Sequence, residues 1–248
     1  TISRRQYFLR IKNLETGEVY KDVIENTTGG SVWANDNKTI FYTKKDPTTL
    51  RSEKIYRHIL GTSASEDIEV FHEKDETFGT YVTKSKSDKY IIIGSYSTVS
   101  TEAQYLDADN PTGEFTMLQK RERDLEYSVS HFGDDFYLLT NKDNATNFKL
   151  MKTPVSMTAK ENWTDVIPHR EDTLLEDFSI FKEYLVLEER TNGLNMVRIK
   201  RWDKTDDFYL PFNEETYSVG VYSNPDFDTH VIRYSYNSMT TPASVITV

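Results

Sequence analysis

Short segments in which apolar and polar residues alternate recur along the chain, joined in pairs by turns rich in Asp, Asn, Lys and Gly. This alternation is typical of β-strands that bury one face. One strand–turn–strand unit occurs five times with small variations. The first residue after each turn recurs at spacings of 50, 46, 48 and 47 residues: Ile40, Tyr90, Phe136, Tyr184 and Val231. A repeat of this length made of short strands predicts a β-propeller with four-stranded antiparallel blades.

The repeats predict one partial β-propeller domain over residues 1–248. The expected blades cover residues 1–24 (partial), 30–72, 75–120, 125–168, 173–212 and 216–248 (partial). Both ends of the chain look cut, because neither the first nor the last blade contains a full set of strands. An incomplete ring exposes strand edges, and unpaired edges invite pairing with another chain. We therefore expect an open arc or edge-mediated self-association.

The expected inner strands are apolar at consecutive positions, as in residues 90–93 and 184–187. Continuous apolar strands are typical of sheets covered on both faces, whereas a sandwich favours strict alternation. No segment sustains a helical period over three turns, and residues 172–178 offer at most a single turn. The prediction is an all-β protein whose blades stack face to face.

Composition and charge narrow the possible partners. The net charge of −10 and the isoelectric point near 5.1 argue against a nucleic-acid partner, which requires a basic surface, but an acidic surface can attract basic peptides. No apolar run approaches the roughly 18 residues of a membrane helix, so no membrane partner is expected. The absence of cysteine excludes disulfides and thiolate nucleophiles and suits a reducing compartment, so we expect a cytoplasmic location.

Catalytic motifs are absent from the chain. None of the 10 glycines belongs to a Gly-x-Ser-x-Gly nucleophile elbow, and the five histidines form neither a pair four residues apart nor a His-Glu-x-x-His motif. We therefore expect no Ser-Asp-His triad, metal or cofactor, and no peptidase activity from this chain alone.

Several unusual local strings occur in a fixed order and are more specific than the repeat itself. They are residues 3–7 (SRRQY), 13–17 (NLETG), 32–36 (VWAND), 56–62 (YRHILGT), 73–78 (EKDETF), 126–128 (EYS), 147–150 (NFKL), 188–190 (EER) and 233–242 (RYSYNSMTTP). Together they closely resemble the propeller domain of the oligopeptidase B (protease II) branch of the prolyl oligopeptidase family of serine peptidases. The resemblance covers essentially all 248 residues.

The resemblance implies a seven-bladed propeller, of which this chain would supply about five and a half blades. It implies a substrate-gating domain of a serine endopeptidase that cleaves short peptides after Arg or Lys. The partners would be a catalytic α/β-hydrolase domain of the same polypeptide, absent from this chain, and short basic peptides. The alternative is a free-standing propeller that binds peptide or protein without catalysis, since a propeller fold alone implies no activity.

Two groups of charged residues are candidates for contacts outside the propeller. Arg4 and Arg5 are adjacent cations just ahead of a predicted strand, and one of them is expected to form an ion pair with the catalytic domain. Glu73, Asp75 and Glu76 are candidates for facing the central cavity.

Overall fold

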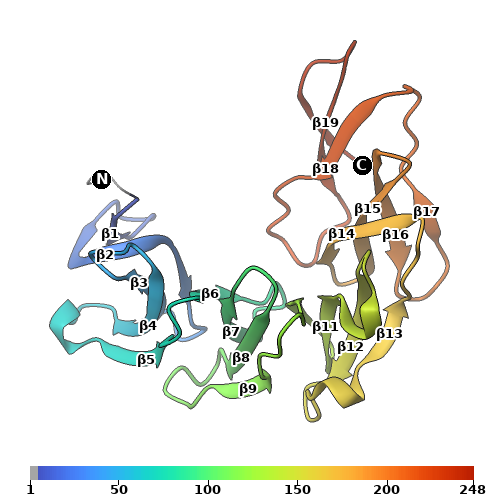
Figure 1. Ribbon diagram of the computed structural model, residues 1–248. Coiled ribbons are helices and arrows are strands. Elements are labelled where there is room, and N and C mark those ends of the chain that lie inside the picture. The colour runs from blue at the N-terminus through green and yellow to red at the C-terminus, as the bar shows by residue number, and fades with distance from the viewer. Residues whose placement is uncertain (1–4) are drawn as a thin grey trace. The chain divides into compact units, whose positions relative to one another are not determined.

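The computed structural model describes residues 5–248, which fold into twenty β-strands arranged in five antiparallel sheets (Figure 1). Within this range the only helices are single 3₁₀ turns: η1 (Ala64–Glu66), η2 (Lys142–Asn144) and η3 (Lys160–Asn162). No helix among these residues is long and apolar enough to cross a membrane. The chain divides into two compact units, Thr1–Asp124 and Leu125–Val248. The prediction of an all-β fold is confirmed.

The first sheet of the N-terminal unit has five strands in sequence order. They are β1 (Tyr7–Lys12), β2 (Val19–Trp33), β3 (Thr39–Lys45), β4 (Ser52–Ile59) and β5 (Ile68–His72). The sequence placed a blade boundary between residues 24 and 30, but β2 continues through it and pairs with both β1 and β3. The pairing of β2 with β3 contains a register shift between Thr27 and Ser31, which marks a β-bulge or irregularity in the strand.

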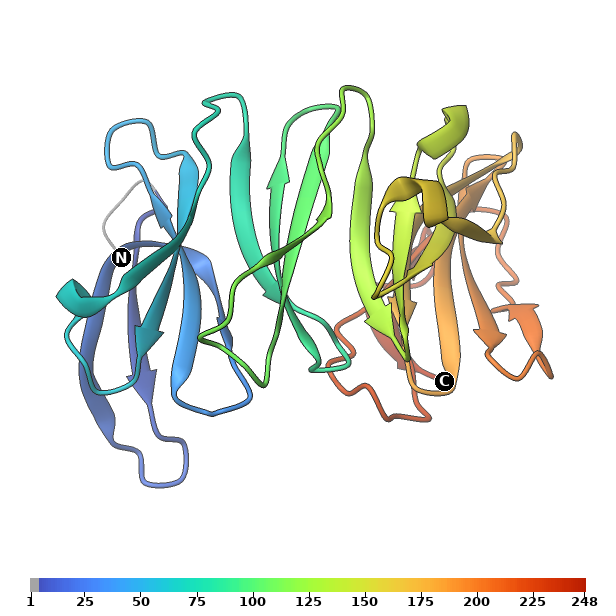
Figure 2. The same cartoon turned by 90° about the horizontal axis from the view of Figure 1, so that it is seen from below.

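The second sheet of this unit has four strands: β6 (Gly79–Lys84), β7 (Tyr90–Tyr96), β8 (Thr101–Asp107) and β9 (Thr116–Gln119). The two sheets lie side by side (Figure 2) and share one apolar core. Phe41 from β3 is fully buried in it, with Ile91 and Ile93 from β7. Burying these faces against each other removes apolar surface from water, which is the main force holding the sheets together.

Asn35, from the VWAND string, links the two sheets through its side chain and backbone. Its Nδ2 donates to the Asp109 carboxylate at 2.7 Å and to the Asp88 carbonyl at 3.0 Å, and its Oδ1 accepts from Lys84 Nζ at 2.6 Å. Its backbone N–H donates to the Ala108 carbonyl at 2.9 Å. This distinctive string therefore has a structural role between adjacent sheets.

The C-terminal unit contains three sheets in which strand order again follows the sequence. The first is β10 (Tyr127–Phe132), β11 (Asp135–Thr140), β12 (Lys149–Pro154) and β13 (Thr164–Ile167). The second is β14 (Thr173–Ile180), β15 (Tyr184–Thr191), β16 (Leu194–Arg201) and β17 (Asp207–Tyr209). The third is β18 (Tyr217–Val221), β19 (Arg233–Ser238) and β20 (Ser244–Thr247).

Strand β15 shows why the inner strands are apolar at consecutive positions. Leu185 and Leu187 pack in a cluster with residues of the β10–β13 sheet. Tyr184 and Val186 pack in a second cluster with residues of the β18–β20 sheet. Because neighbouring side chains point to opposite faces of a strand, a sheet between two others needs apolar residues at every position. The predicted face-to-face stacking is confirmed within this unit.

The last predicted hairpin is partly wrong. The sequence suggested a turn at residues 225–228 and a strand over residues 229–236, but β19 begins at Arg233. The Asn224 side chain explains the longer connection: its Nδ2 donates to the carbonyls of Tyr222 and Arg233, and its Oδ1 accepts from the Arg233 N–H at 2.7 Å. Hydrogen bonds from the Asn224 side chain thus replace strand pairing in this loop. Asparagine side chains commonly bond to nearby backbone groups and so compete with regular secondary structure.

Candidate functional site

Residues 73–78 form a loop between β5 and β6 and contain all three acidic residues that the sequence selected. The carboxylate of Glu73, a residue only 3% exposed, accepts a hydrogen bond from Arg121 on each oxygen, at 2.6 and 3.3 Å. The Asp75 N–H donates to Glu73 Oε1 at 3.0 Å. Because its oxygens are occupied inside the protein, Glu73 anchors the loop and is not free to bind a ligand.

Arg121 follows β9 and contacts two further residues besides Glu73. Its Nη2 also lies 3.1 Å from Oε1 of Glu102 on β8, and its guanidinium carbon lies 3.9 Å from the centre of the Phe78 ring. Burial alone would raise the pKa of Glu73, but the hydrogen bonds from Arg121 and from the Asp75 N–H outweigh it and hold that pKa below its usual range. The carboxylate therefore stays ionised and paired.

Arg51 braces the backbone of the same loop. Its Nη1 donates to three carbonyl oxygens, those of Glu73 at 3.1 Å, Asp75 at 3.2 Å and Phe78 at 2.9 Å. Its Nη2 lies 3.0 Å from the carboxylate of Glu53 on β4. One planar guanidinium can satisfy several acceptors at once, which a lysine cannot do with the same geometry. Arg51 thus binds the backbone of the loop, and Arg121 binds its Glu73 and Phe78 side chains.

The exposed part of the loop carries two carboxylates. Oδ1 of Asp75 accepts from the Thr77 hydroxyl at 2.7 Å and from the Thr77 N–H at 2.9 Å, and these bonds hold the pKa of Asp75 below its ordinary value. Glu76 is exposed and forms no ion pair or hydrogen bond with any residue in the described range 5–248. The exposed part of the loop therefore presents two carboxylates, of which Asp75 also lies 4.0 Å from Nη1 of Arg121.

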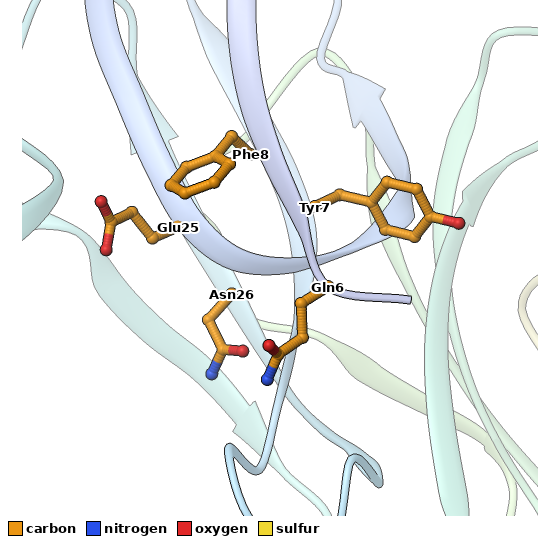
Figure 3. A pocket seen from close by; sticks show the side chains of 5 residues that line it. All are labelled: Gln6, Tyr7, Phe8, Glu25 and Asn26. Carbon is orange, nitrogen blue, oxygen red and sulfur yellow. The ribbon is translucent and has the colours of Figure 1, made fainter. Parts of the chain in front are cut away.

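The predicted basic pair lies at the beginning of the described chain. Arg4 lies outside the described residues, whereas Arg5 is exposed, has a φ of 59° and accepts a hydrogen bond on its carbonyl from Lys45 Nζ at 2.8 Å. Next to it is a shallow pocket of about 80 Å³, lined by Gln6, Tyr7, Phe8, Glu25 and Asn26 (Figure 3). Tyr7 and Phe8 point to opposite sides of β1 (Figure 3).

The sequence did not reveal the arginines that support the acidic loop. Arg51 lies 22 residues and Arg121 48 residues from Glu73, with no repeat or motif that connects them. Only the pairing of strands in space brings them to the loop. No sequence pattern indicated that Glu73 is buried either, because an acidic string normally indicates an exposed turn.

The chain whose five sheets are described above matches a known class of domain. The family model "Prolyl oligopeptidase, N-terminal beta-propeller domain" matches residues 1–248, and the chain belongs to this family. The predicted β-propeller and the predicted resemblance are both confirmed.

Individual relatives agree with this assignment. The chain is 43% identical to dipeptidyl aminopeptidase BI of Pseudoxanthomonas mexicana, over 98% of this chain and 34% of the relative. It is 31% identical to Protease 2 of Moraxella lacunata, over 96% of this chain and 34% of the relative. Among solved structures, oligopeptidase B from Leishmania major superposes with a TM-score of 0.91 at 26% identity, over 98% of this chain and 36% of that protein. The chain therefore spans about a third of the length of these relatives.

Proposed function

We propose that this propeller acts as the substrate-gating domain of a serine peptidase, next to an α/β-hydrolase catalytic domain of the same polypeptide. The observation that carries the proposal is the family match over the whole chain, to relatives about three times its length. A propeller over a hydrolase cleft admits short peptides, excludes folded proteins by size and separates the nucleophile from bulk water. The chain contributes shape and inter-domain contacts, and the triad lies elsewhere.

The proposed substrates are short peptides cleaved after Arg or Lys. The likeness to Protease 2 and to oligopeptidase B supports this class. The net charge of −10 supports it independently, because an acidic protein attracts basic peptides by long-range electrostatics. Asp75 and Glu76, on the loop that Arg51 and Arg121 hold, add negative charge that contributes to this electrostatic attraction.

A second candidate is removal of dipeptides from peptide N-termini, the activity that the name dipeptidyl aminopeptidase describes. The 43% identity to the Pseudoxanthomonas protein favours it. The two candidates share the fold and the gating role. They differ in whether the substrate needs a free amino terminus.

We expect the full-length protein containing this chain to hydrolyse a short peptide with one internal Arg. Replacing that Arg by Gln is expected to slow hydrolysis at least about tenfold, because the site loses its charged partner. The same sequence inside a folded protein is expected to resist cleavage. Mass spectrometry of the products, with an N-terminally acetylated peptide in parallel, distinguishes the candidates: acetylation blocks a dipeptidyl aminopeptidase and leaves an endopeptidase unaffected. Binding of peptide without any hydrolysis would support the free-standing propeller instead.

Arg4 and Arg5 are proposed to contribute an ion pair to the catalytic domain. In the full-length protein, the double change Arg4→Ala/Arg5→Ala is expected to lower kcat/KM severalfold and to weaken its dependence on ionic strength, because the domains lose a charged contact in the closed state. The matched control is Lys12→Ala, which removes an exposed cation from the end of β1, the strand that follows Arg5. Unchanged kinetics in the double variant would exclude this role.

A further inference from the structure

The connection between β18 and β19 covers residues 222–232 and is longer than the corresponding connection in each of the other four sheets (Figure 1). Those connections cover residues 34–38, 85–89, 133–134 and 181–183. Loops that a rigid sheet positions are frequent places for binding residues. Here the longer connection and the start of β19 form a pocket of about 210 Å³, which is lined by Asn224, Asp226, Thr229, Val231 and Arg233.

The β14–β15 hairpin holds this connection in place. The Tyr184 hydroxyl donates to the Thr229 carbonyl at 2.8 Å. The Lys182 N–H donates to the Phe227 carbonyl at 3.1 Å, and Lys182 Nζ lies 2.6 Å from Oδ2 of Asp228. The Phe227 side chain also packs against the apolar cluster that contains Leu185. The pocket is therefore formed in the free protein, as ligand sites usually are.

The neutral polar side chains that line the pocket are used within the connection itself. Asn224 bonds to the backbone of Tyr222 and Arg233 through both ends of its amide. The Thr229 hydroxyl donates to the Val231 carbonyl and accepts from the Val231 N–H, both at 3.2 Å. These groups shape the pocket and have little capacity left for a ligand.

The two charged side chains that line the pocket have no such partners. Within residues 5–248, the Arg233 guanidinium and the Asp226 carboxylate form no hydrogen bond or ion pair, either with each other or with another residue. A guanidinium matches a carboxylate through two parallel N–H groups, and a carboxylate accepts hydrogen bonds from an ammonium group. A simple anion would be repelled by Asp226 and a simple cation by Arg233. A ligand that carries both charges satisfies both side chains.

We propose that this pocket binds a dipeptide as a zwitterion, with its carboxylate on Arg233 and its ammonium group on Asp226. A pocket of this volume has room for several water molecules and hence for a ligand of a few heavy atoms. The source of the ligand rests on the proposed function, because hydrolysis of short peptides releases fragments that carry a free carboxylate and a free ammonium group. Binding itself requires no hydrolysis.

Isothermal titration calorimetry of the full-length protein with three probes tests the two charges separately. Glycylglycine carries both charges, N-acetylglycylglycine only the carboxylate and glycylglycinamide only the ammonium group. We expect glycylglycine to bind at least tenfold more tightly than either of the others, because each lacks one charge-assisted contact. Equal affinity for glycylglycine and either of the other probes would overturn the proposal. So would the absence of glycylglycine binding at millimolar concentrations.

Two variants assign the charges to the pocket. Arg233→Gln is expected to bind glycylglycine and glycylglycinamide equally, and Asp226→Asn to bind glycylglycine and N-acetylglycylglycine equally. The matched control is Asp228→Asn, on the same connection but outside the pocket lining, where an amide oxygen can still accept from Lys182. This control should keep the wild-type affinities. Unchanged affinities in both pocket variants would place the binding elsewhere and overturn the proposal.

A hydrolysis assay of the same protein separates this inference from the proposed function. Peptide hydrolysis without glycylglycine binding would contradict the pocket alone. Glycylglycine binding that depends on Arg233 and Asp226, without any hydrolysis, would support the pocket and contradict the proposed peptidase.

Discussion

Arg121→Ala is expected to lower the free energy of unfolding by about 3 kcal/mol, because it leaves the carboxylate of Glu73 buried without its cation. The side chains of Arg121 and Glu73 are 27% and 4% exposed, so water can replace little of the lost contact. The change also removes the stacking on Phe78 and the second contact, to Glu102. Urea denaturation of the chain measures the effect.

The pH dependence of this effect follows from the lowered pKa of Glu73. The stabilisation is fully present above the ordinary carboxyl pKa of about 4.3 and is lost as the pH falls through the lower pKa of the folded state. The difference between wild type and Arg121→Ala should therefore shrink in acid.

The control is Arg123→Ala, two residues away. The Arg123 side chain is 90% exposed and, among residues 5–248, forms an ion pair only with the exposed Asp124, at 3.7 Å, so its loss should leave the unfolding free energy nearly unchanged. Equal effects of the two substitutions would show that the buried pair contributes nothing specific. Arg121→Lys should be intermediate, because an ammonium cannot bind two carboxylates and stack on Phe78 in the same way.

Leu185→Ala is expected to lower the free energy of unfolding by about 2–5 kcal/mol, the usual cost of a cavity at a buried leucine. Leu185 is fully buried on β15 and packs in the cluster that joins the β14–β17 sheet to the β10–β13 sheet. The substitution would remove apolar contacts between these two sheets as well as contacts within the β14–β17 sheet. Urea denaturation monitored by tryptophan fluorescence is suitable, since Trp202 packs against the same cluster.

Met157→Ala is the matched control for this substitution. It also truncates a large apolar side chain in the C-terminal unit, but Met157 is 55% exposed. A change within about 0.5 kcal/mol is expected there. A small loss for Leu185→Ala as well would mean that the sheets do not depend on face-to-face packing for stability.

The distinctive strings of the sequence have different roles in the structure. Asn35 links two adjacent sheets, and His58 is buried between the carboxylates of Asp22 and Asp67. Glu214 accepts hydrogen bonds from Tyr236, Thr240 and Thr241 of the RYSYNSMTTP string. The hydroxyl of Ser238, followed by that of Thr240, lowers the pKa of Glu214 to about 2. These strings identified the family correctly, but the side chains described, such as Asn35 and His58, make contacts within the fold. The contact of Arg4 or Arg5 with a catalytic domain remains a prediction, and so does the central-cavity position of Glu73, Asp75 and Glu76.

The sequence by itself determined the repeat, the all-β fold and the family, because alternation and turn chemistry act over a few residues and leave a readable pattern. It also determined that β15 is covered on both faces, since its apolar residues are consecutive. Only the tertiary structure decided that Glu73 is buried, that Arg51 and Arg121 brace its loop and that Asp22 and Asp67 meet at His58. These partners come from separate strands or from the loops that follow them. Their contacts arise only when the strands pair, so no local pattern records them.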